Sequence, residues 1–315
     1  MKAKNKAVLG HLSDMDIRLL QIFKAVVDCG GFSSAELDLN IGMSTISRHI
    51  KDLEIRLGFT LCQRGRKGFL LTPQGKRVYD ETLRLLAAIN DFRASIDDVH
   101  GRLGGELHVA VFEKTTGNPH ARLDHAVAIF TDLAPDVMVN LHVRPINEIE
   151  RGVLDSRYHI GIIPDHRPSN SLAYMPLFHE EMRLYCGLEH PLFNVPTSQL
   201  GWDDLRQIPL AGLAYHSPNM EVSHRARLTR RANAYDQEGV ATFILSGRFV
   251  GFLPTHYALP FEQQGSMQAI EPDRFKYQVA FFAISPRTPT STGAAALFLD
   301  CLRQAHVEAP STAVT

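Results

Sequence analysis

The apolar residues at the start of the chain follow helical spacing. Residues 14–29 carry apolar side chains at gaps of three and four before the pair Gly30-Gly31, which predicts a core helix with a glycine C-cap. Two further short helices are predicted, one capped by the pair Ser33-Ser34 and running to Asn40, and one capped by Ser44 or Thr45 and running to Leu57. The expected core positions of the first helix are Ile17, Leu20, Phe23 and Val27.

The third predicted helix has one apolar and one polar face. Its apolar residues recur at gaps of four, three and four, which predicts a single buried stripe and leaves a basic face in solvent. The stripe consists of Ile46, Ile50, Leu53 and Leu57. After Gly58, residues 59–71 predict a hairpin whose tip, residues 65–68, is cationic.

A long helix is predicted from Thr72 and Pro73 to the glycines at 101–105, because no helix breaker intervenes. Its apolar residues alternate gaps of four and three, as in a coiled-coil seam that a single helix would leave in water. The seam consists of Val78, Thr82, Leu85, Ile89, Phe92, Ile96 and Val99. Residues 101–105 (GRLGG) predict a linker.

Beyond the linker, the pattern changes to alternating strands and helices. The order strand, helix, strand, helix, strand predicts a largely parallel sheet covered by helices. These elements are expected at residues 106–112, 119–133, 137–143, 146–154 and 159–163. A second set is expected with strands at 183–187, 209–213, 248–253 and 277–284 and helices at 222–232, 238–245 and 293–305.

These patterns divide the chain into three parts. Residues 1–72 are expected to form an all-α domain with a hairpin, residues 73–103 a long helix, and residues 104–315 an α/β domain.

Charge is distributed unevenly in a chain whose net charge is −1. Residues 1–102 hold 16 Lys and Arg against 12 Asp and Glu, and residues 44–78 are the most basic stretch. A basic patch in a neutral protein is expected for a polyanion partner, although a solvated charged face explains it equally well alone. No apolar run is long enough for a membrane span and no secretory signal is recognised, so a cytoplasmic location is expected.

Cysteine and histidine spacing predicts neither a metal site nor a disulfide framework. The four cysteines are isolated in sequence, and the 15 histidines form no HExxH or Cys/His cluster. No metal and no cofactor are therefore predicted. The cysteines lie at positions 29, 62, 186 and 301.

The residues above resemble the LysR-type transcriptional regulators along essentially the whole chain. The strongest matches are residues 15–23 (MDIRLLQIF), 31–35 (GFSSA), 44–50 (STISRHI) and 71–75 (LTPQG). In the C-terminal half, residues 152–155 (GVLD), 160–162 (IGI) and 250–254 (VGFLP) also match. Three positions depart from the family pattern, namely Glu36, the pair Gly42-Met43 and His159, and Met43 cannot make the paired contact to adenine that a glutamine makes there.

The resemblance implies a multidomain fold class: an all-α winged helix-turn-helix plus linker helix, then an α/β two-lobed, periplasmic-binding-protein-like effector domain. The expected boundaries are 1–72 for the winged helix, 73–103 for the linker and dimerisation helix, and 104–315 for the effector domain, with lobe one at 104–164 plus 270–306 and lobe two at 165–269.

The resemblance further implies a DNA-binding transcription regulator that acts as a homodimer or homotetramer on double-stranded DNA with an imperfect inverted repeat. RNA polymerase is a further candidate partner, and no membrane association is expected. The residues expected to contact DNA are Ser33, Ser34, Ser44, Thr45, Ser47, Arg48, Lys51, Arg64, Arg66, Lys67, Thr72 and Gln74.

A small-molecule effector, a carboxylate, is expected in the cleft between the two lobes. Ligands of open α/β sheets gather beyond the carboxyl ends of the strands, where helix N-termini present free N–H groups. The effector residues expected there are Thr115, Thr116, Asn118, Asn147, Tyr215, His216, Ser217, Phe252 and Pro254.

Two other functions compete with this interpretation. A redox sensor would work through Cys186 and Cys301, although nothing beside them marks a reactive thiol. An α/β enzyme would use the same cleft for catalysis, but the chain has no GxSxG elbow, GxGxxG fingerprint or P-loop, and no catalytic residue is predicted.

Overall fold

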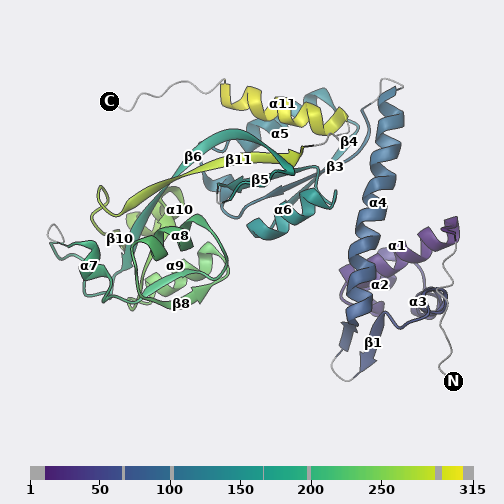
Figure 1. Cartoon of the computed structure of the whole chain (residues 1–315), viewed down its shortest axis with the longest axis horizontal. Helices are drawn as coiled ribbons and strands as arrows, with labels where there is room; N and C mark the ends of the chain where they lie inside the picture. Colours follow the sequence, from purple (N-terminus) through teal and green to yellow (C-terminus); the bar gives the residue numbers. More distant parts are fainter. Residues whose placement is uncertain are drawn as a thin grey trace. The chain divides into compact units, whose positions relative to one another are not determined.

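The computed structural model describes residues 11–65, 68–99, 103–165, 167–196, 200–287 and 293–307. The chain divides into two compact units, Met1–Ile89 and Asn90–Thr315, which are treated separately below. Figure 1 labels their helices and strands. No helix of the described residues is long and apolar enough to cross a lipid bilayer.

The N-terminal unit is a three-helix core followed by a hairpin and a long helix. Its described elements are α1 (Asp14–Asp28), α2 (Phe32–Leu39), α3 (Met43–Leu57), β1 (Cys62–Gly65), β2 (Gly68–Leu71) and α4 (Pro73–Val99), the last of which continues beyond the unit. The order confirms the predicted winged helix-turn-helix and linker helix.

Helix α1 begins with a capping box. Ser13 and Asp16 exchange hydrogen bonds, with the Ser13 N–H donating to Asp16 Oδ2 at 2.9 Å. The helix buries Leu19, Phe23 and Val26, whereas Ile17 and Val27 are only half-buried. The buried face of α1 is therefore displaced by about one residue from the predicted face.

The predicted caps of α2 and α3 were wrong by two to three residues. Gly31 and Gly42 are the N-caps, so the serines expected to cap these helices lie inside their first turns. The buried stripe of α3 is confirmed, because Ile46, Ile50 and Leu53 are buried. Gly58 ends α3 at φ 80°, a left-handed backbone that favours glycine.

The hairpin and the start of α4 agree with their predictions. Strands β1 and β2 pair antiparallel from Cys62 opposite Leu71 to Gly65 opposite Gly68. The tip residues 66 and 67 lie outside the described residues. At the start of α4, Thr72 Oγ1 accepts the Gly75 N–H at 2.9 Å, and Pro73 occupies the first turn.

The first half of the C-terminal unit alternates strands and helices as predicted. Its elements are β3 (Gly105–Val111), η1 (Thr115–Gly117), α5 (Leu123–Leu133), β4 (Val137–Val143), α6 (Ile146–Leu154) and β5 (Ile160–Pro164). Strand β3 pairs in parallel with β4 and with β5. The start of the predicted linker, residues 101 and 102, lies outside the described residues.

The second half differs more from its prediction. Its elements are β6 (Leu172–Gly187), α7 (Trp202–Leu205), β7 (Leu210–Leu213), α8 (Pro218–Arg225), β8 (Arg230–Ala234), α9 (Gln237–Leu245), β9 (Val250–Pro254), α10 (Thr255–Gln263), β10 (Met267–Ala269), β11 (Lys276–Pro286) and α11 (Gly293–Val307). The helix expected at 222–232 is wrong at its end, because Arg230–Ala234 is a strand with Ala232 and Ala234 buried. Helix α10 was not predicted.

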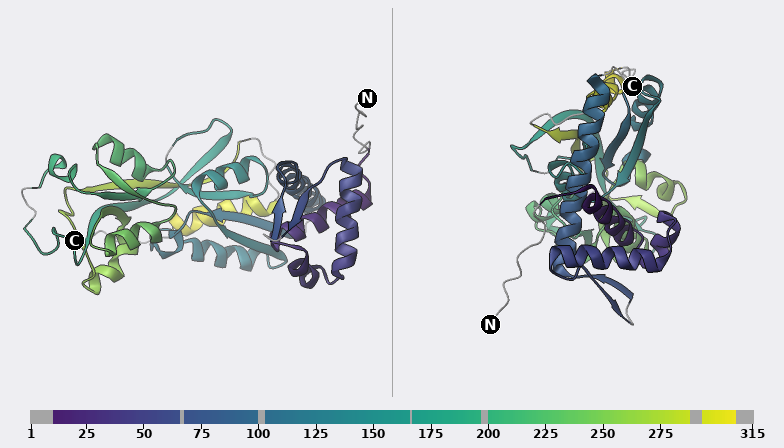
Figure 2. Two further views of the ribbon diagram at one scale, coloured as in Figure 1. Left: turned by 90° about the horizontal axis from the view of Figure 1, so that it is seen from below. Right: turned by 90° about the vertical axis from the view of Figure 1, so that its right-hand side faces the viewer.

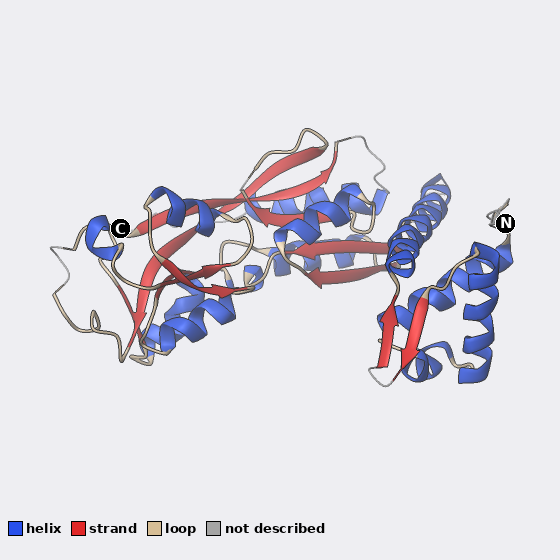
Figure 3. Ribbon diagram, turned by 60° about the horizontal axis from the view of Figure 1, so that its bottom comes forward, coloured by secondary structure: helices blue, strands red, loops and turns tan. Residues whose placement is uncertain are grey.

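A mixed sheet runs through the whole C-terminal unit in the order β4-β3-β5-β11-β6-β9-β7-β8, with β10 beside β6. The parallel sheet expected over residues 106–163 is confirmed, since β3 pairs in parallel with β4 and β5. The sheet as a whole is mixed, because β11 pairs antiparallel with β5 and β6, and β6 pairs antiparallel with β9 and β10. Parallel pairing is confined to the sets at its two ends. Strands β6 and β11 lie side by side along the unit (Figures 2 and 3).

The two parallel sets form two lobes. Lobe one contains β3, β4 and β5 with α5, α6 and α11, and its helices meet where Phe130 packs on Phe298 at 5.3 Å between ring centres. Lobe two contains β7, β8 and β9 with α8, α9 and α10, around a second core that includes Val240, Ile244 and Leu253. Strands β6 and β11 pass through both lobes.

Candidate functional site

A polar face of α3 stands free on the N-terminal unit. Thr45, Arg48 and Lys51 are exposed on α3, and Ser44 is exposed in its first turn. The buried stripe of α3 occupies the opposite side, so packing against α1 fixes which way the polar face points. A helix with such a face can enter the major groove of DNA.

The other residues expected to contact DNA lie in different environments. Ser33, Ser34 and Gln74 are exposed and Ser47 is half-buried. Thr72 is 8% exposed, and its hydroxyl donates to Thr60 O at 2.8 Å while accepting the Gly75 N–H, so the hydroxyl is occupied inside the protein. The Arg64 side chain and residues Arg66 and Lys67 lie outside what the structure describes.

An ion pair joins α3 to α1 on the side opposite its polar face. Arg56 of α3 donates to Asp16 of α1 at 2.7 Å, and Asp16 is 2% exposed. Hydrogen bonds from Ser13, together with Arg56, hold the pKa of the Asp16 carboxyl below its usual value. Nearby, Glu54 Oε1 accepts the Leu61 N–H at 2.7 Å and so joins α3 to the start of the hairpin.

A small cavity lies between the lobes of the C-terminal unit, at the carboxyl ends of strands from both. Its volume is about 20 Å³, the size of one water molecule. Lobe one contributes Phe112, Ile146 and Pro164, which follow or end β3, β4 and β5. The remaining lining residues are Glu180, Met182, Leu213, Ser217, Pro218, Asn219, Gln237, Tyr277 and Val279.

Of the expected effector residues only Ser217 lines this cavity, and two others hydrogen-bond to carboxyl groups near it. Ser217 lines it and caps α8 by accepting the Met220 N–H. Asn118 is buried and donates through Nδ2 to Glu180 Oε1 at 3.3 Å. Tyr215 donates its hydroxyl to Glu113 Oε1 at 3.3 Å across the two lobes.

The remaining expected effector residues do not line the cavity. The Thr115 hydroxyl donates to Phe112 O at 2.6 Å inside the protein, while Thr116 and Asn147 are exposed. His216 is exposed and lies 3.4 Å from Glu221. Phe252 and Pro254 are buried in the sheet at the end of β9, where Phe252 packs on the Tyr277 ring.

Sequence reasoning missed two carboxyl groups near the cavity, the half-buried Glu113 and the buried Glu180. Burial raises the pKa of each carboxyl group to about 7. Hydrogen bonds from Gln237 to Glu113 and from Asn118 to Glu180 oppose these shifts, and the charge of Glu113 raises the pKa of Glu180 further. Glu113 Oε2 accepts the Gln237 N–H at 2.9 Å. Glu113 could have been found from sequence as an acid placed just after the first strand, but Glu180 sits inside a long strand and gives no such signal.

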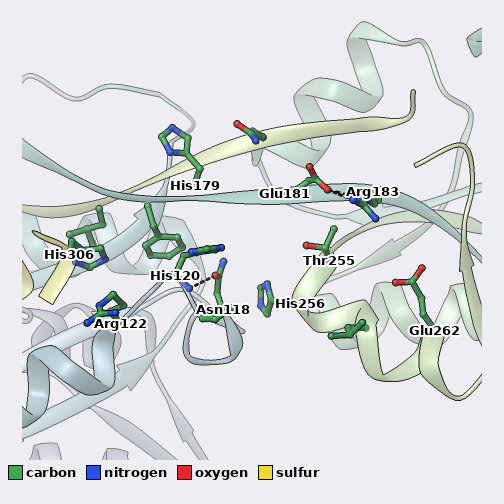
Figure 4. A pocket seen from close by; sticks show the side chains of 15 residues that line it. Asn118, His120, Arg122, His179, Glu181, Arg183, Thr255, His256, Glu262 and His306 are labelled. Carbon is green, nitrogen blue, oxygen red and sulfur yellow. Dashed lines mark hydrogen bonds and ion pairs between the residues drawn. The ribbon is translucent and has the colours of Figure 1, made fainter. Parts of the chain in front are cut away.

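A second, open hollow of about 1010 Å³ lies next to the cavity. Figure 4 shows Arg122 and His306 towards one end of it and Thr255 and Glu262 towards the other, where the Glu181–Arg183 pair also lies. Alternate side chains of β6 line the two hollows, because Glu180 and Met182 face the small cavity whereas the odd-numbered neighbours face the open one.

The two cysteines considered for redox sensing are buried. Cys186 and Cys301 are at most 1% exposed, and burial raises the pKa of both thiols, to about 11 for Cys186. A buried thiol with a raised pKa is a poor nucleophile, which argues against a sensor at these positions. Among the described residues no group of three His, Cys, Asp or Glu could hold a metal ion.

Comparison with known families agrees with both halves of the molecule. Residues 17–76 match the model of the bacterial regulatory helix-turn-helix protein, lysR family, and residues 100–306 match the LysR substrate binding domain. The HTH-type transcriptional activator BauR of Pseudomonas aeruginosa is 40% identical over 284 residues, covering 90% of this chain and 93% of the relative. The probable regulator LrrA of Synechococcus elongatus is 26% identical over 304 residues, covering 95% and 100%.

Solved structures show the same fold. Full-length CbnR in complex with its target DNA superimposes with a TM-score of 0.64 at 20% identity, covering 92% of this chain and 99% of CbnR. Full-length OxyR from Pseudomonas aeruginosa gives a TM-score of 0.59 at 16% identity, covering 93% and 95%. At these identities the likeness concerns the fold alone.

Proposed function

This chain belongs to the LysR-type transcriptional regulators, and from that premise we propose that a small carboxylate, bound between lobes one and two, controls its action on DNA. The family makes the chain a DNA-binding regulator with an effector-binding domain. Members of this family are regulators rather than enzymes, which confirms the prediction that the chain is not an enzyme. A cytoplasmic location is part of the proposal, because the regulator must reach its DNA.

The proposed DNA interface is the polar face of α3 with the hairpin beside it. Arg48 and Lys51 would face base edges and phosphates in the major groove, and the cationic tip at Arg66 and Lys67 would lie on the backbone. Exposure of the α3 side chains supports this arrangement. Thr72 would contribute by fixing the start of α4, since its hydroxyl already has protein partners.

The proposed dimer interface is α4. Phe92 is 68% exposed and Ile96 is 45% exposed on this helix, although both belong to the predicted apolar seam. Nearer its start, Val78 and Leu85 pack on the core of the N-terminal unit and line an apolar hollow of about 470 Å³. Pairing of two α4 helices would cover the exposed residues and place two recognition helices on an inverted repeat, in a dimer or in a tetramer of such dimers.

The cavity between the lobes is the observation that supports an effector site most strongly. It lies beyond the carboxyl ends of parallel strands from both lobes, and the first residues of α6 and α8, Ile146 and Pro218, line it. Helix N-termini carry positive partial charge and free N–H groups, which suit a carboxylate. A ligand held by both lobes would also favour one relative position of the lobes over others.

A charge placed in the cavity tests the proposal. Ser217→Asp keeps an N-cap for α8, because aspartate caps as well as serine does, but adds a negative charge where the carboxylate would bind. Calorimetric titration of full-length protein with a panel of small carboxylates, amino acids included, should give an affinity at least about tenfold lower in this variant.

Thr116→Asp is the matched control, because Thr116 is exposed and lines neither hollow. Its affinity for the same carboxylate should equal that of the unaltered protein, and both variants should bind operator DNA normally without effector. Equal carboxylate affinities in Ser217→Asp and Thr116→Asp would move the effector site away from the cavity.

A further inference from the structure

The floor of the interlobe cavity presents hydrogen-bond acceptors that the protein does not satisfy. Glu180 is 6% exposed, and its contacts among the described residues are Asn118 Nδ2 at 3.3 Å and His256 Nδ1 at 3.6 Å. Gln237 is 3% exposed, and its buried Oε1 has no hydrogen-bond partner. Both side chains line the same cavity.

Among the described residues no cation lies free beside these acceptors, and the unpartnered donor that shares the cavity is the neutral Tyr277 hydroxyl. Burial lowers the pKa of His256, so its imidazole is a neutral neighbour of Glu180 at neutral pH. Lys114 is engaged elsewhere, with Nζ 2.8 Å from Glu238 Oε1 and 4.7 Å from the centre of the Tyr257 ring. The second carboxyl group, Glu113, adds negative charge near Glu180.

An unpaired carboxylate in such a place is costly. Removing a carboxylate from water costs several kcal/mol, and the group otherwise takes up a proton instead. Burial accordingly raises the pKa of Glu180 to about 7, so the group is poised between its two charge states. A buried polar group without a partner is rare in proteins and calls for an explanation, and a ligand that satisfies it is one such explanation.

From this arrangement we propose that the effector carries a protonated amine as well as a carboxylate, with the amine bound by the Glu180 carboxylate and the Gln237 carbonyl oxygen. This inference rests on the effector site proposed above. The carboxylate would lie at the N-termini of α6 and α8, which line the cavity through Ile146 and Asn219. The ligand class is therefore a small amino acid.

The closed state of the cavity limits the size of this ligand. At about 20 Å³ the cavity holds one water, so the lobes must separate to admit an amino acid. The contacts that close them are the Tyr215–Glu113 and Gln237–Glu113 hydrogen bonds and the Lys114–Glu238 ion pair. A short ligand would fit with the smallest separation.

Matched probes distinguish the amine from the carboxylate. We would titrate full-length protein by calorimetry with the standard amino acids, with straight-chain ω-amino acids of two to four carbons, and with the corresponding carboxylates and amines that lack the other group. An amino acid should bind at least about tenfold more tightly than the carboxylate and the amine of the same length.

Glu180→Gln should remove this preference. The variant keeps the size of the side chain and its contact with Asn118, so its affinity for the amino acid should fall at least about tenfold while that for the matched carboxylate stays the same. Glu181→Gln is the control, because Glu181 faces the open hollow and pairs with Arg183. Circular dichroism would check that both variants fold.

Proton release provides a second readout. Because burial raises the pKa of Glu180 to about 7, the carboxyl group is partly protonated near neutral pH, and binding an ammonium would ionise it and release a fraction of a proton per site. Titrations in buffers of different ionisation enthalpy measure that number. The release should vanish in Glu180→Gln, whereas Asn118, His256, Tyr277 and Glu113, which also face this carboxyl group, remain in place.

Two results would overturn the inference. If the amine-free carboxylate binds as tightly as the amino acid and Glu180→Gln changes nothing, the amine is wrong while the carboxylate effector site stands. If no amino acid and no carboxylate of the panel binds, both the inference and the proposed effector site fail.

Discussion

The N-terminal and C-terminal units present their proposed ligand-binding side chains differently. In the N-terminal unit these polar side chains are exposed on one face of a single helix, α3. In the C-terminal unit the side chains proposed to bind the effector are buried and come from strands and helices of both lobes. Arg48 and Lys51 are in solvent. Glu180 and Gln237 are 6% and 3% exposed. DNA is a large polyanion that comes to a surface, but a small molecule must be surrounded to be recognised.

This difference determines how each region tolerates change. A side chain on an exposed face can be replaced without loss of the fold, because the buried stripe on the other side of α3 carries the packing. A side chain in the cavity is part of the packing itself, since the same sheet that holds Glu180 also joins the lobes. The following predictions test this contrast from the largest expected effect to the smallest.

Phe92→Asp should have the largest effect. A charge on the exposed seam of α4 would oppose pairing of two helices without disturbing the fold of one chain, because Phe92 is 68% exposed. We expect monomers by light scattering and a loss of operator affinity of about 100-fold or more, because the second half-site is no longer held. Phe92→Leu should remain dimeric. A stable dimer of Phe92→Asp with normal operator affinity would place the interface elsewhere.

Asp16→Asn tests whether the exposed face depends on a buried support. The change removes the charge that pairs with Arg56 and weakens the capping box of α1, so the free energy of unfolding of the N-terminal unit should fall by about 1–3 kcal/mol. Hydrogen exchange of α1 and α3 amides measures the loss. Glu81→Gln, which breaks an exposed pair with Arg84, should change stability by less than about 0.5 kcal/mol.

The same residue gives a pH dependence. Because the pKa of Asp16 is lowered in the folded protein, its stabilisation is complete well above its usual value of 3.8 and is lost as the pH falls through the folded pKa. The difference between the native protein and Asp16→Asn should therefore shrink below about pH 4. A difference independent of pH would mean that the charge of Asp16 does not matter.

Arg48→Ala should weaken operator binding by about tenfold and reduce the preference for operator over scrambled DNA, because a base contact contributes to specificity. Fluorescence anisotropy at fixed salt measures both. Arg84→Ala is the charge-matched control, since Arg84 lies on α4 and pairs with Glu81. Equal losses of operator affinity in the two variants would mean that only the positive charge matters, and would contradict a role of the α3 face in base recognition.

Arg66→Ala should have the smallest effect. Removing one phosphate contact should lower the affinity for operator and scrambled DNA by the same factor, and should reduce the slope of log affinity against log salt by about 0.9. Gel shifts at several salt concentrations give the slope. A change in sequence preference would assign the hairpin tip a role in base recognition.

The sequence predicted the N-terminal unit well because its signals are local. The stripe from Ile46 to Leu53, the positive φ at Gly58 and the cap at Thr72 each depend on residues a few positions apart. The errors there are small and have local causes. Glycines occupy the N-cap positions at 31 and 42, and the serines that follow them lie inside the helices.

The sequence predicted the position of the cavity better than its chemistry. The rule that ligands gather at carboxyl ends of strands led to Ser217 and Asn118, because each follows a strand in the chain. Glu180 was missed because its role depends on β6 passing between the lobes, and that pairing joins residues about a hundred positions apart in β11. The hydrophobic pattern of one strand does not reveal which distant strand pairs with it, so the pairing of β6 with β11 could not be predicted from the sequence.

The passage of β6 and β11 through both lobes has a mechanical consequence. The two lobes are connected by neighbouring strands whose backbone hydrogen bonds continue from Lys276 opposite Arg183 to Pro286 opposite Leu172. A connection of this kind resists sliding and stretching, since either would break the ladder, but it yields to twisting. The register shifts between Phe281 and Phe282, and because such an irregularity interrupts the ladder and increases the local twist, twisting would concentrate there. A ligand held by both lobes would therefore set the angle by which one lobe is twisted relative to the other about β6 and β11.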